Sequence, residues 1–376
     1  MPFNFPNNFL ARNGLYALAM ARAFARFRDP RRRAIWWHRV EFYEKAWREA
    51  AQEVGASFTM LGSDIHQIAL GEFCTRVTEN TCAIDDPVTL AVVSDKPLTY
   101  RILATQSLPV ARHAGFSFKN LKPALEFIAE IDGECVIKPA TGTGGGRGVT
   151  TGVRTVWQLG RAAAAAAVYG DTLLIEEQIG GDNYRLLYLD GELLDAFVRK
   201  PPTVIGDGRS TVARLLHAQN SDRLRHGSGQ SQALLSIDLD MRRTLAKQKL
   251  SLRSVPARGM EVVLKTVVND NCGIDNSNAA RLLCPSIVED AAKAVRALQI
   301  RLAGVDVITA DPTVPLAKSG GAILEVNAPP NFYYHYHKSD GACPVAVHVL
   351  RRLMKCESVH PLAQSKPLAS RYEAAE

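Results

Sequence analysis

The order of hydrophobic and polar residues predicts alternating helices and strands in the first part of the chain. A helix is expected over residues 10–27, and a second one carries "YEKAWREAAQEVG" and ends at Gly55, since glycine commonly ends a helix. Short β-rich segments follow, such as "FCTRV" and "VTLAVVS". The segment "DKPLTYRILATQSLP" then predicts a helix that begins near Asp95 and stops before Pro109.

The middle of the chain shows the same alternation. We expect a strand over residues 134–138, a further strand at "GVTTGV", and then a helix that contains the alanine run Ala162–Ala167. Alanine is the strongest helix former, which makes this helix the firmest prediction of the segment. The strand "DTLLIEEQI" follows it.

The last part of the chain opens with a hairpin. In "YRLLYLDGELLDAFVRKPP", the pair Asp190-Gly191 stands between two apolar runs, which is a strong turn signal. A helix over 285–302 leads into two apolar strands, "GVDVITA" and "GAILEVNA". The pattern predicts an α/β (α+β) fold with units at 1–94, 95–180 and 181–355, and a polar, disordered tail at 356–376.

Composition narrows the class of protein. Of 376 residues, 47% are hydrophobic and 22% are charged, which is typical of a globular protein of two or three domains, and no apolar run reaches membrane-spanning length. The net charge of +7 suits anionic ligands such as nucleotides. No specific nucleic-acid partner is expected, because the body of the chain carries neither a zinc-finger spacing nor a long basic tract.

The basic helix near the N-terminus has two interpretations. It could serve as a targeting or membrane-surface segment, or it could pack on the protein with its basic face in solvent. We favour the packed helix, because the segment lacks the compact apolar stretch and cleavage site of a signal peptide.

The cysteines argue against two further classes of protein. Their number is odd and no pair forms a CxxC motif, which disfavours a disulfide framework and a structural zinc site. Reduced thiols and a cytoplasmic location are therefore expected. The seven are Cys74, Cys82, Cys135, Cys272, Cys284, Cys343 and Cys356.

The glycine loop, Gly142–Gly148, is the most informative motif. It follows Lys138, and Arg147 interrupts it. Consecutive glycines let backbone N–H groups surround a phosphate. A Walker A loop would place its lysine after the glycines, and the dinucleotide fingerprint would require glycines at other positions. Because "VTTGV" is β-branched, we expect a mobile β-hairpin lid over a triphosphate; a flexible glycine turn is the simpler alternative.

Two carboxylates lie in apolar strand-like runs near the end of the chain. Asp306 and Glu325 are expected on neighbouring strands, and Asn327 lies on the same strand face as Glu325. Carboxylate and amide oxygens suit Mg²⁺, whereas an isolated Asp is more often a turn or cap residue. The apolar surroundings favour the metal interpretation, because an unpaired buried charge is costly.

Five segments in this order resemble the ATP-grasp superfamily of carboxylate–amine ligases. They are Asp95-Lys96, "VIKPATGTGGGRGV", "IEEQIGGDNYRLL", "GVDV" and "GAILEVNAPP". The resemblance covers residues 90–355. It extends in particular to the ATP-grasp region of cyanophycin synthetase and to the ATP-grasp part of bifunctional glutathione synthetase. A Mur-ligase-like domain, which cyanophycin synthetase also carries, is not seen in this sequence, so a complete cyanophycin synthetase is not expected.

The resemblance implies the architecture and the role of each site residue. A pre-ATP-grasp-like N-terminal domain (1–94) would precede a central lid subdomain (95–180) and a C-terminal subdomain with the metal site (181–355). Arg147, Arg185 and Arg199 would be catalytic, through the phosphoryl group or a substrate carboxylate. Asp306, Glu325 and Asn327 would hold Mg²⁺, with Mn²⁺ as a substitute. ATP would be bound by Lys96, Lys138, Gly142, Thr143, Gly144, Gly145, Gly146, Glu176, Gln178, Ile179 and Asn183.

Two departures from the family pattern concern residues expected to contact the nucleotide or the substrate. Asn183 stands where the pattern has an acid at the ribose, and Tyr333 stands where it has an arginine. The cluster "NFYYHYH" is therefore expected to line a more aromatic pocket. His335 and His337 could form a metal pair, but we favour packing or substrate contact.

The function implied is an ATP-dependent ligase that joins the carboxylate of an amino acid or short peptide to an amine through an acyl phosphate. Relatives suggest a homodimer. Two alternatives remain open: another ATP-grasp phosphotransferase or carboxylase, and a non-catalytic protein that binds a nucleotide or a nucleic acid.

Overall fold

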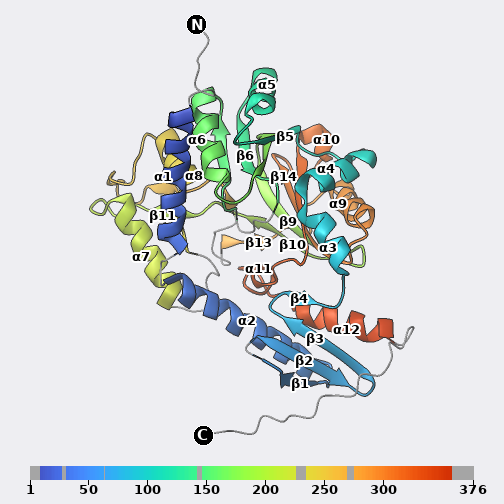
Figure 1. Ribbon diagram of the computed structural model, residues 1–376. Coiled ribbons are helices and arrows are strands. Elements are labelled where there is room, and N and C mark those ends of the chain that lie inside the picture. The colour runs from blue at the N-terminus through green and yellow to red at the C-terminus, as the bar shows by residue number, and fades with distance from the viewer. Residues whose placement is uncertain are drawn as a thin grey trace.

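In the computed structural model, the chain forms antiparallel sheets with helices packed on them (Figure 1). The structure describes residues 9–27, 31–62, 64–141, 146–225, 234–268 and 275–357. Within these residues, no helix is both long and apolar enough to cross a bilayer.

The N-terminal part consists of two long helices and a small sheet. Figure 1 shows the helix α2 extending away from α1 toward the sheet β1-β2-β3-β4, with α12 on the same side of the molecule. Trp47 and Tyr43 of α2 share a core with Phe332 and with α12. Its elements are α1 (Phe9–Phe27), α2 (Arg31–Glu53), β1 (Ser57–Met60), β2 (Ile65–Leu70), β3 (Phe73–Thr78) and β4 (Thr81–Cys82). The helices α3 (Pro87–Ser94) and α4 (Lys96–Thr105) follow in the chain, and α12 (Val345–Glu357) packs on α2.

The middle part is a four-stranded antiparallel sheet in the order β5-β8-β6-β7. The helix α6 packs on it through buried alanines of the predicted run, and α1 in turn packs against α6. The basic N-terminal helix is thus docked on the protein, as we favoured. The elements are β5 (His113–Ser117), α5 (Lys122–Glu130), β6 (Cys135–Pro139), β7 (Thr150–Val153), α6 (Val156–Ala166) and β8 (Thr172–Glu177).

The third part is a five-stranded sheet in the order β13-β10-β9-β14-β15. The predicted hairpin is present: β9 and β10 pair through a turn in which Asp190 and Gly191 both have positive φ. The helix α9 covers the sheet, and Leu103 of α4 belongs to the same core. The elements are β9 (Asp182–Leu189), β10 (Glu192–Arg199), β13 (Ser277–Asn278), α9 (Pro285–Ala297), β14 (Leu302–Thr309), α10 (Leu316–Ser319), β15 (Ala322–Asn327) and α11 (Tyr333–Tyr336).

A further group of elements has its own core inside the range predicted as a single C-terminal unit. Val212, Met241 and Val262 are buried together there. The sequence pattern alone does not separate this group from the rest of the predicted unit. Its elements are β11 (Thr203–Ile205), α7 (Val212–Arg225), α8 (Leu239–Lys247) and β12 (Glu261–Val263).

Two predicted elements differ from the structure. The segment "VTLAVVS", predicted as β-rich, is the helix α3, because the Asp86 side chain accepts hydrogen bonds from the N–H groups of Val88 and Thr89. The helix predicted over 285–302 ends at Ala297, where Gln299 turns to positive φ and β14 begins at Leu302.

The remaining predictions concern the tail and the cysteines. The start of the predicted tail is helical up to Glu357, and 358–376 lies outside the described residues. Five cysteines are free thiols, namely Cys74, Cys82, Cys135, Cys284 and Cys343, whereas Cys272 and the side chain of Cys356 lie outside what the structure describes. The domain boundaries stay a prediction.

Candidate functional site

A cavity of about 510 Å³ opens between the middle sheet, the five-stranded sheet and the N-terminal part. It brings together residues that are more than 200 positions apart in sequence. The predicted site residues that line it are Lys96, Lys138, Gly146, Glu176, Gln178, Ile179, Asn183, Arg185, Arg199, Asp306, Glu325 and Asn327.

Among the predicted residues that the structure describes, Arg147 is not one that lines the cavity. Arg147 is exposed, so its role at the phosphates stays a prediction. Gly142, Thr143, Gly144 and Gly145 lie outside the described residues. The strands on either side, β6 and β7, pair antiparallel, so the glycine loop does connect the two strands of a hairpin.

Both predicted lysines are ion-paired at the wall of the cavity. The Lys138 Nζ lies 2.6 Å from Glu176 Oε1 and donates to the Tyr100 hydroxyl at 3.2 Å. Burial and the adjacent Glu176 raise the pKa of Tyr100 well above its ordinary value, so the hydroxyl stays protonated. The Lys96 Nζ lies 3.0 Å from Glu325 Oε1. The lysines are therefore held in place by the carboxylates beside them.

The segment after β8 forms the hinge side of the cavity. The Gln178 N–H donates to the Glu134 carbonyl at 2.8 Å, and its Oε1 accepts from the Gly152 N–H at 2.6 Å. Gly181 has φ +127°, and a Cβ there would lie 2.2 Å from the Thr309 carbonyl carbon. Only glycine fits where the chain passes so close to β14.

One face of the five-stranded sheet presents a buried charge cluster to the cavity. Asp306 on β14 is the register partner of Arg185 on β9 and of Glu325 on β15. The Arg185 guanidinium donates to Asp306 through Nε at 2.5 Å and Nη2 at 3.0 Å, and Arg199 also ion-pairs with Asp306. The Arg199 Nε donates to Asn183 Oδ1 at 2.9 Å. These contacts order both arginines beside the predicted metal ligands.

The charge cluster determines the ionisation of Asp306. Burial alone would raise the pKa of this carboxyl, but the guanidiniums of Arg185 and Arg199 outweigh burial and lower it. Burial also disfavours the charged form of Arg199, and for a guanidinium this lowers the pKa. Asp306 is therefore an anion in the folded protein.

The predicted metal ligands meet, as their placement on neighbouring strands required. Asp306 and Glu325 are cross-strand partners, and the Asn327 Nδ2 lies 3.3 Å from Asp306 Oδ2. Two carboxylates and an amide oxygen form a hard donor set that fits Mg²⁺. Within the described residues, no group of three or more His, Cys, Asp and Glu side chains lies where it could hold a metal.

The N-terminal part contributes residues that sequence reasoning missed. Arg39 of α2 and Asn80, in the β3–β4 turn, both line the cavity. The Arg39 Nη2 donates to Asn80 Oδ1 at 3.2 Å, and the Asn80 Nδ2 donates to the Pro329 carbonyl at 2.8 Å. No local motif marks either residue. Only the spatial approach of residues 249 positions apart reveals them.

The aromatic cluster lines the cavity in part only. Tyr334 borders the cavity, whereas Tyr333 is buried in the core shared with α2. The His335 Nδ1 lies 2.8 Å from Asp195 Oδ2, and the His337 ring stacks on Tyr333. Both histidines are packing residues in this arrangement, which is the interpretation that we favoured over a metal pair.

Comparison with known proteins gives relatives that are named as cyanophycin synthetases and as glutathione biosynthesis proteins. No model of a known protein family matches the chain. Cyanophycin synthetase from Nostoc sp. is 35% identical over 251 residues, which cover 66% of this chain and 27% of that protein. The glutathione biosynthesis bifunctional protein GshAB from Streptococcus mutans is 30% identical over 271 residues, or 70% of this chain and 35% of that protein. The chain thus spans about a third or less of the length of these relatives.

One solved structure shows the fold. The bifunctional glutathione synthetase from Pasteurella multocida superposes with a TM-score of 0.54 at 20% sequence identity, over 83% of this chain and 43% of that one. The resemblance inferred from the motifs is confirmed in sequence and in fold. The chain has the ATP-grasp fold and belongs to the ATP-grasp superfamily.

Proposed function

We propose that the protein is an ATP-dependent carboxylate–amine ligase whose active site is the cavity of about 510 Å³. One observation carries the proposal. Two lysines, two arginines, three carboxylates and three amides, all predicted from scattered motifs, line this single cavity. The relatives named as cyanophycin synthetase and glutathione biosynthesis proteins support an amide-forming reaction.

The nucleotide would lie against the middle sheet. Lys138 and Lys96 would contact its phosphates, and the hinge of Gln178 and Ile179 would contact the base. Asn183 would be close to the ribose. Glu176 is ion-paired with Lys138 at 2.6 Å, so an adenine contact through this carboxylate would have to share it with the lysine.

Asp306, Glu325 and Asn327 would hold Mg²⁺, and Mn²⁺ should replace it. The ion would neutralise charge on the phosphates of the nucleotide. In the structure the Asp306 carboxylate also binds Arg185 and Arg199, so both guanidiniums would lie within reach of the same phosphates. The arginines would then stabilise the charge of the transferring phosphoryl group or bind a substrate carboxylate.

The reaction would proceed in two steps. The substrate carboxylate oxygen attacks the γ-phosphorus of ATP, giving an acyl phosphate and ADP. An amine then attacks the acyl carbon, the amide bond forms, and phosphate leaves. A closed glycine loop would protect the acyl phosphate from water.

The acceptor side of the cavity would be the one bordered by Arg39, Asn80 and Tyr334. The chain leads there directly from Glu325 and Asn327, since Asn80 binds the carbonyl of Pro329. An amino acid or short peptide is the substrate class that we propose for it. A homodimer and a cytoplasmic location remain predictions.

The test is a screen for ADP release. The full chain is incubated with MgATP and with pairs of amino acids and dipeptides, and products are analysed by mass spectrometry. We expect ADP release that depends on the presence of an amine, together with an amide product. Phosphorylated product without an amine would indicate a phosphotransferase, and steeply salt-dependent nucleic-acid binding without ATP turnover would indicate a binding protein.

A pair of lysine variants shows whether the cavity is the active site. Lys138→Ala should lower the rate about 10²–10³-fold, because it removes a charge that stabilises the transferring phosphoryl group. Lys122→Ala changes an exposed lysine of α5 in the same part of the molecule and should leave the rate unchanged. A normal rate for Lys138→Ala would contradict the proposed site.

A further inference from the structure

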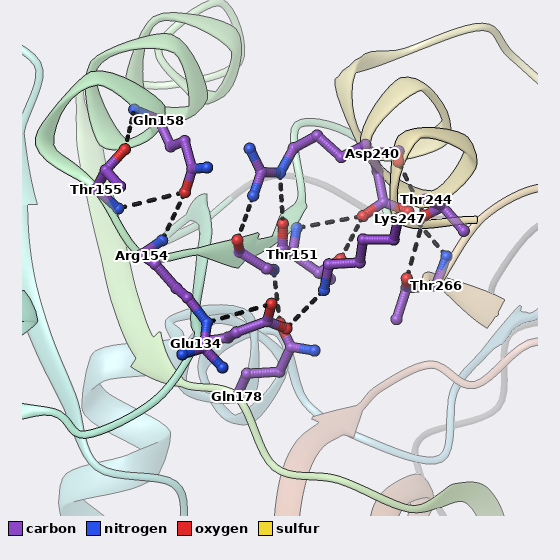
Figure 2. A network of polar contacts seen from close by, with 12 residues as sticks. Glu134, Thr151, Arg154, Thr155, Gln158, Gln178, Asp240, Thr244, Lys247 and Thr266 are labelled. Atoms are coloured by element: carbon purple, nitrogen blue, oxygen red, sulfur yellow. Dashed lines mark hydrogen bonds and ion pairs between the residues drawn. The ribbon is translucent and has the colours of Figure 1, made fainter. Parts of the chain in front are cut away.

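Asp240 on α8 is a fully buried carboxylate outside the predicted site. It lies in the group of elements that the sequence pattern alone does not separate, and α8 packs against the strand β7 of the glycine-loop hairpin. Figure 2 shows its contacts with Thr151 and Thr266 at the centre of a polar network. A buried charge is costly unless it is well hydrogen-bonded, so its partners are informative.

The two oxygens of this carboxylate bind two different segments. Asp240 Oδ1 accepts from the Thr151 N–H at 3.2 Å and from the Thr151 hydroxyl at 2.7 Å. Asp240 Oδ2 accepts from the N–H groups of Thr266 at 3.0 Å and Val267 at 3.3 Å. Four donors thus converge on one side chain.

Both segments are walls of the proposed nucleotide cavity. Thr151 belongs to β7, and Thr266 and Val267 follow β12; all three residues line the cavity. Asp240 itself is not among the residues that line it. The carboxylate therefore joins the glycine-loop hairpin to a neighbouring segment of the cavity wall, without lining the cavity itself.

Other residues of α8 hold the same hairpin. The Arg243 Nε donates to the Thr151 carbonyl at 3.0 Å, and its guanidinium also binds the Gly152 carbonyl. The Lys247 Nζ binds Glu134 Oε2 at 2.6 Å. Because residues three and four apart share a helix face, Asp240 and Arg243 both reach β7, and Lys247 reaches Glu134 directly before β6. Figure 2 shows the Lys247 and Asp240 side chains leading from the helix to this sheet.

The network continues to the hinge. The Gly152 N–H donates to Gln178 Oε1 at 2.6 Å, and Gln178 lines the cavity. A chain of hydrogen bonds thus runs from α8 through β7 to a residue that we propose to contact the base.

We propose that Asp240, with Arg243, is a positioning residue for ATP: it holds the glycine-loop hairpin and the segment after β12 at the spacing that the nucleotide requires. The inference rests on the proposed function, since it assumes that the cavity takes ATP. It adds a role for α8, which no motif of the nucleotide site includes.

Because each oxygen of Asp240 binds a different segment, replacing one oxygen by an NH₂ group tests the inference directly. In Asp240→Asn only one side-chain atom remains an acceptor, and the new NH₂ group faces N–H donors. Asparagine can therefore satisfy Thr151 or the Thr266–Val267 segment, but not both, and one wall of the cavity is released.

The experiment measures the KM for ATP, kcat, and ATP binding by calorimetry. Asp240→Asn should raise the KM and the dissociation constant about tenfold while kcat at saturating ATP stays within twofold. A purely structural defect would instead lower the active fraction, and so kcat, at unchanged KM. Asp222→Asn, the same change on α7, is the matched control and should behave as the wild type.

A second pair of variants covers the case in which Asp240→Asn does not fold. Arg243→Met removes the bonds to the hairpin carbonyls and should raise the KM for ATP about three- to tenfold, whereas Arg242→Met changes the exposed neighbouring arginine and should have no effect. If the wild-type protein binds ATP and the variants bind it equally well, the inference about Asp240 is wrong and the proposed function stands. Wild-type protein that binds no ATP would overturn the proposed function.

Discussion

Gly304 leaves the space in which the Arg185 guanidinium reaches Asp306. A Cβ at this position would lie 2.5 Å from Arg185 Nη1 and 3.1 Å from its Cδ. The arginine crosses to β14 and binds the carboxylate through two nitrogens, so the whole side chain would have to move. A single hydrogen atom in place of a methyl group thus permits the charge cluster at the site.

Gly304→Ala should therefore lower the rate of ADP release about tenfold and the free energy of unfolding by about 1–3 kcal/mol, the usual range for overpacking. Enzyme assays and urea unfolding measure the two effects. Gly115→Ala is a suitable control, because Gly115 also lies in a strand but nothing surrounds its Cβ position within 4 Å. Full activity in Gly304→Ala would show that the Arg185–Asp306 pairing is dispensable.

The individual site residues were easier to predict than their partners. Lys138, Asp306 and Glu325 stand in short motifs whose order is informative, and the structure brings them to one cavity. The pairings of Lys138 with Glu176 and of Arg185 with Asp306 depend on strand register. Register is a property of the folded sheet, and local sequence leaves it open.

At the scale of elements, the helix α6 shows how local sequence determines a boundary. Thr155 caps the helix by accepting from the Gln158 N–H, and Gln158 Oε1 accepts from the Thr155 N–H in return. This capping box begins the helix whose buried alanines pack on the β6–β8 sheet.

Loss of this cap should destabilise the protein slightly without altering chemistry. Thr155→Ala is expected to reduce the free energy of unfolding by about 1 kcal/mol, since the Gln158 N–H loses its acceptor. Thr155→Ser retains the hydroxyl and should be close to the wild type. Equal urea midpoints for the alanine and serine variants would contradict the role of the cap.

Helix capping also explains why α3 is a helix, although its residues predicted a β-rich segment. Its β-branched residues favour a strand, yet Asp86 and Pro87 together start a helix there. A cap that binds two backbone N–H groups outweighed intrinsic propensity, which is a weak preference spread over the segment. Asp86 and Pro87 are readable in the sequence, and as a helix start they outweigh the β propensity of the residues that follow.

At the scale of the whole molecule, the N-terminal part could not be placed from sequence. Trp47 of α2 packs against Phe332, and Arg39 of the same helix lines the cavity. The motifs that carry the superfamily resemblance begin at Asp95, so they give no information about the surface of α2. The core shared with α12 makes the N-terminal part a wall of the proposed active site.

A buried polar cluster ties the five-stranded sheet to the segment after β15. The Asp195 carboxylate on β10 binds the His335 Nδ1 at 2.8 Å and the Lys338 Nζ at 2.5 Å. Burial lowers the pKa of His335, and Arg185 and Lys338 add to this effect, against the opposing effect of Asp195. Burial would raise the pKa of Asp195, but His335 and Lys338 lower it.

The stability of the whole protein should consequently fall on acidification. Below a pH of about 6.5 the unfolded chain protonates His335 while the folded protein keeps it neutral, so the unfolded state binds more protons. The loss per proton is at most about 1.4 kcal/mol per pH unit. The stability that Asp195 contributes is retained to lower pH and is lost below its ordinary pKa of about 3.9.

His335→Gln isolates this contribution, because the other titrating groups are common to both proteins. Glutamine keeps a donor for Asp195 but binds no proton, so the variant should be less stable at pH 7 and lose less stability between pH 7 and pH 5. Urea unfolding at pH 7, 6 and 5 measures both slopes. If the two proteins lose stability in parallel, His335 is not the group that couples acidification to unfolding, and the pH dependence must come from other titrating groups.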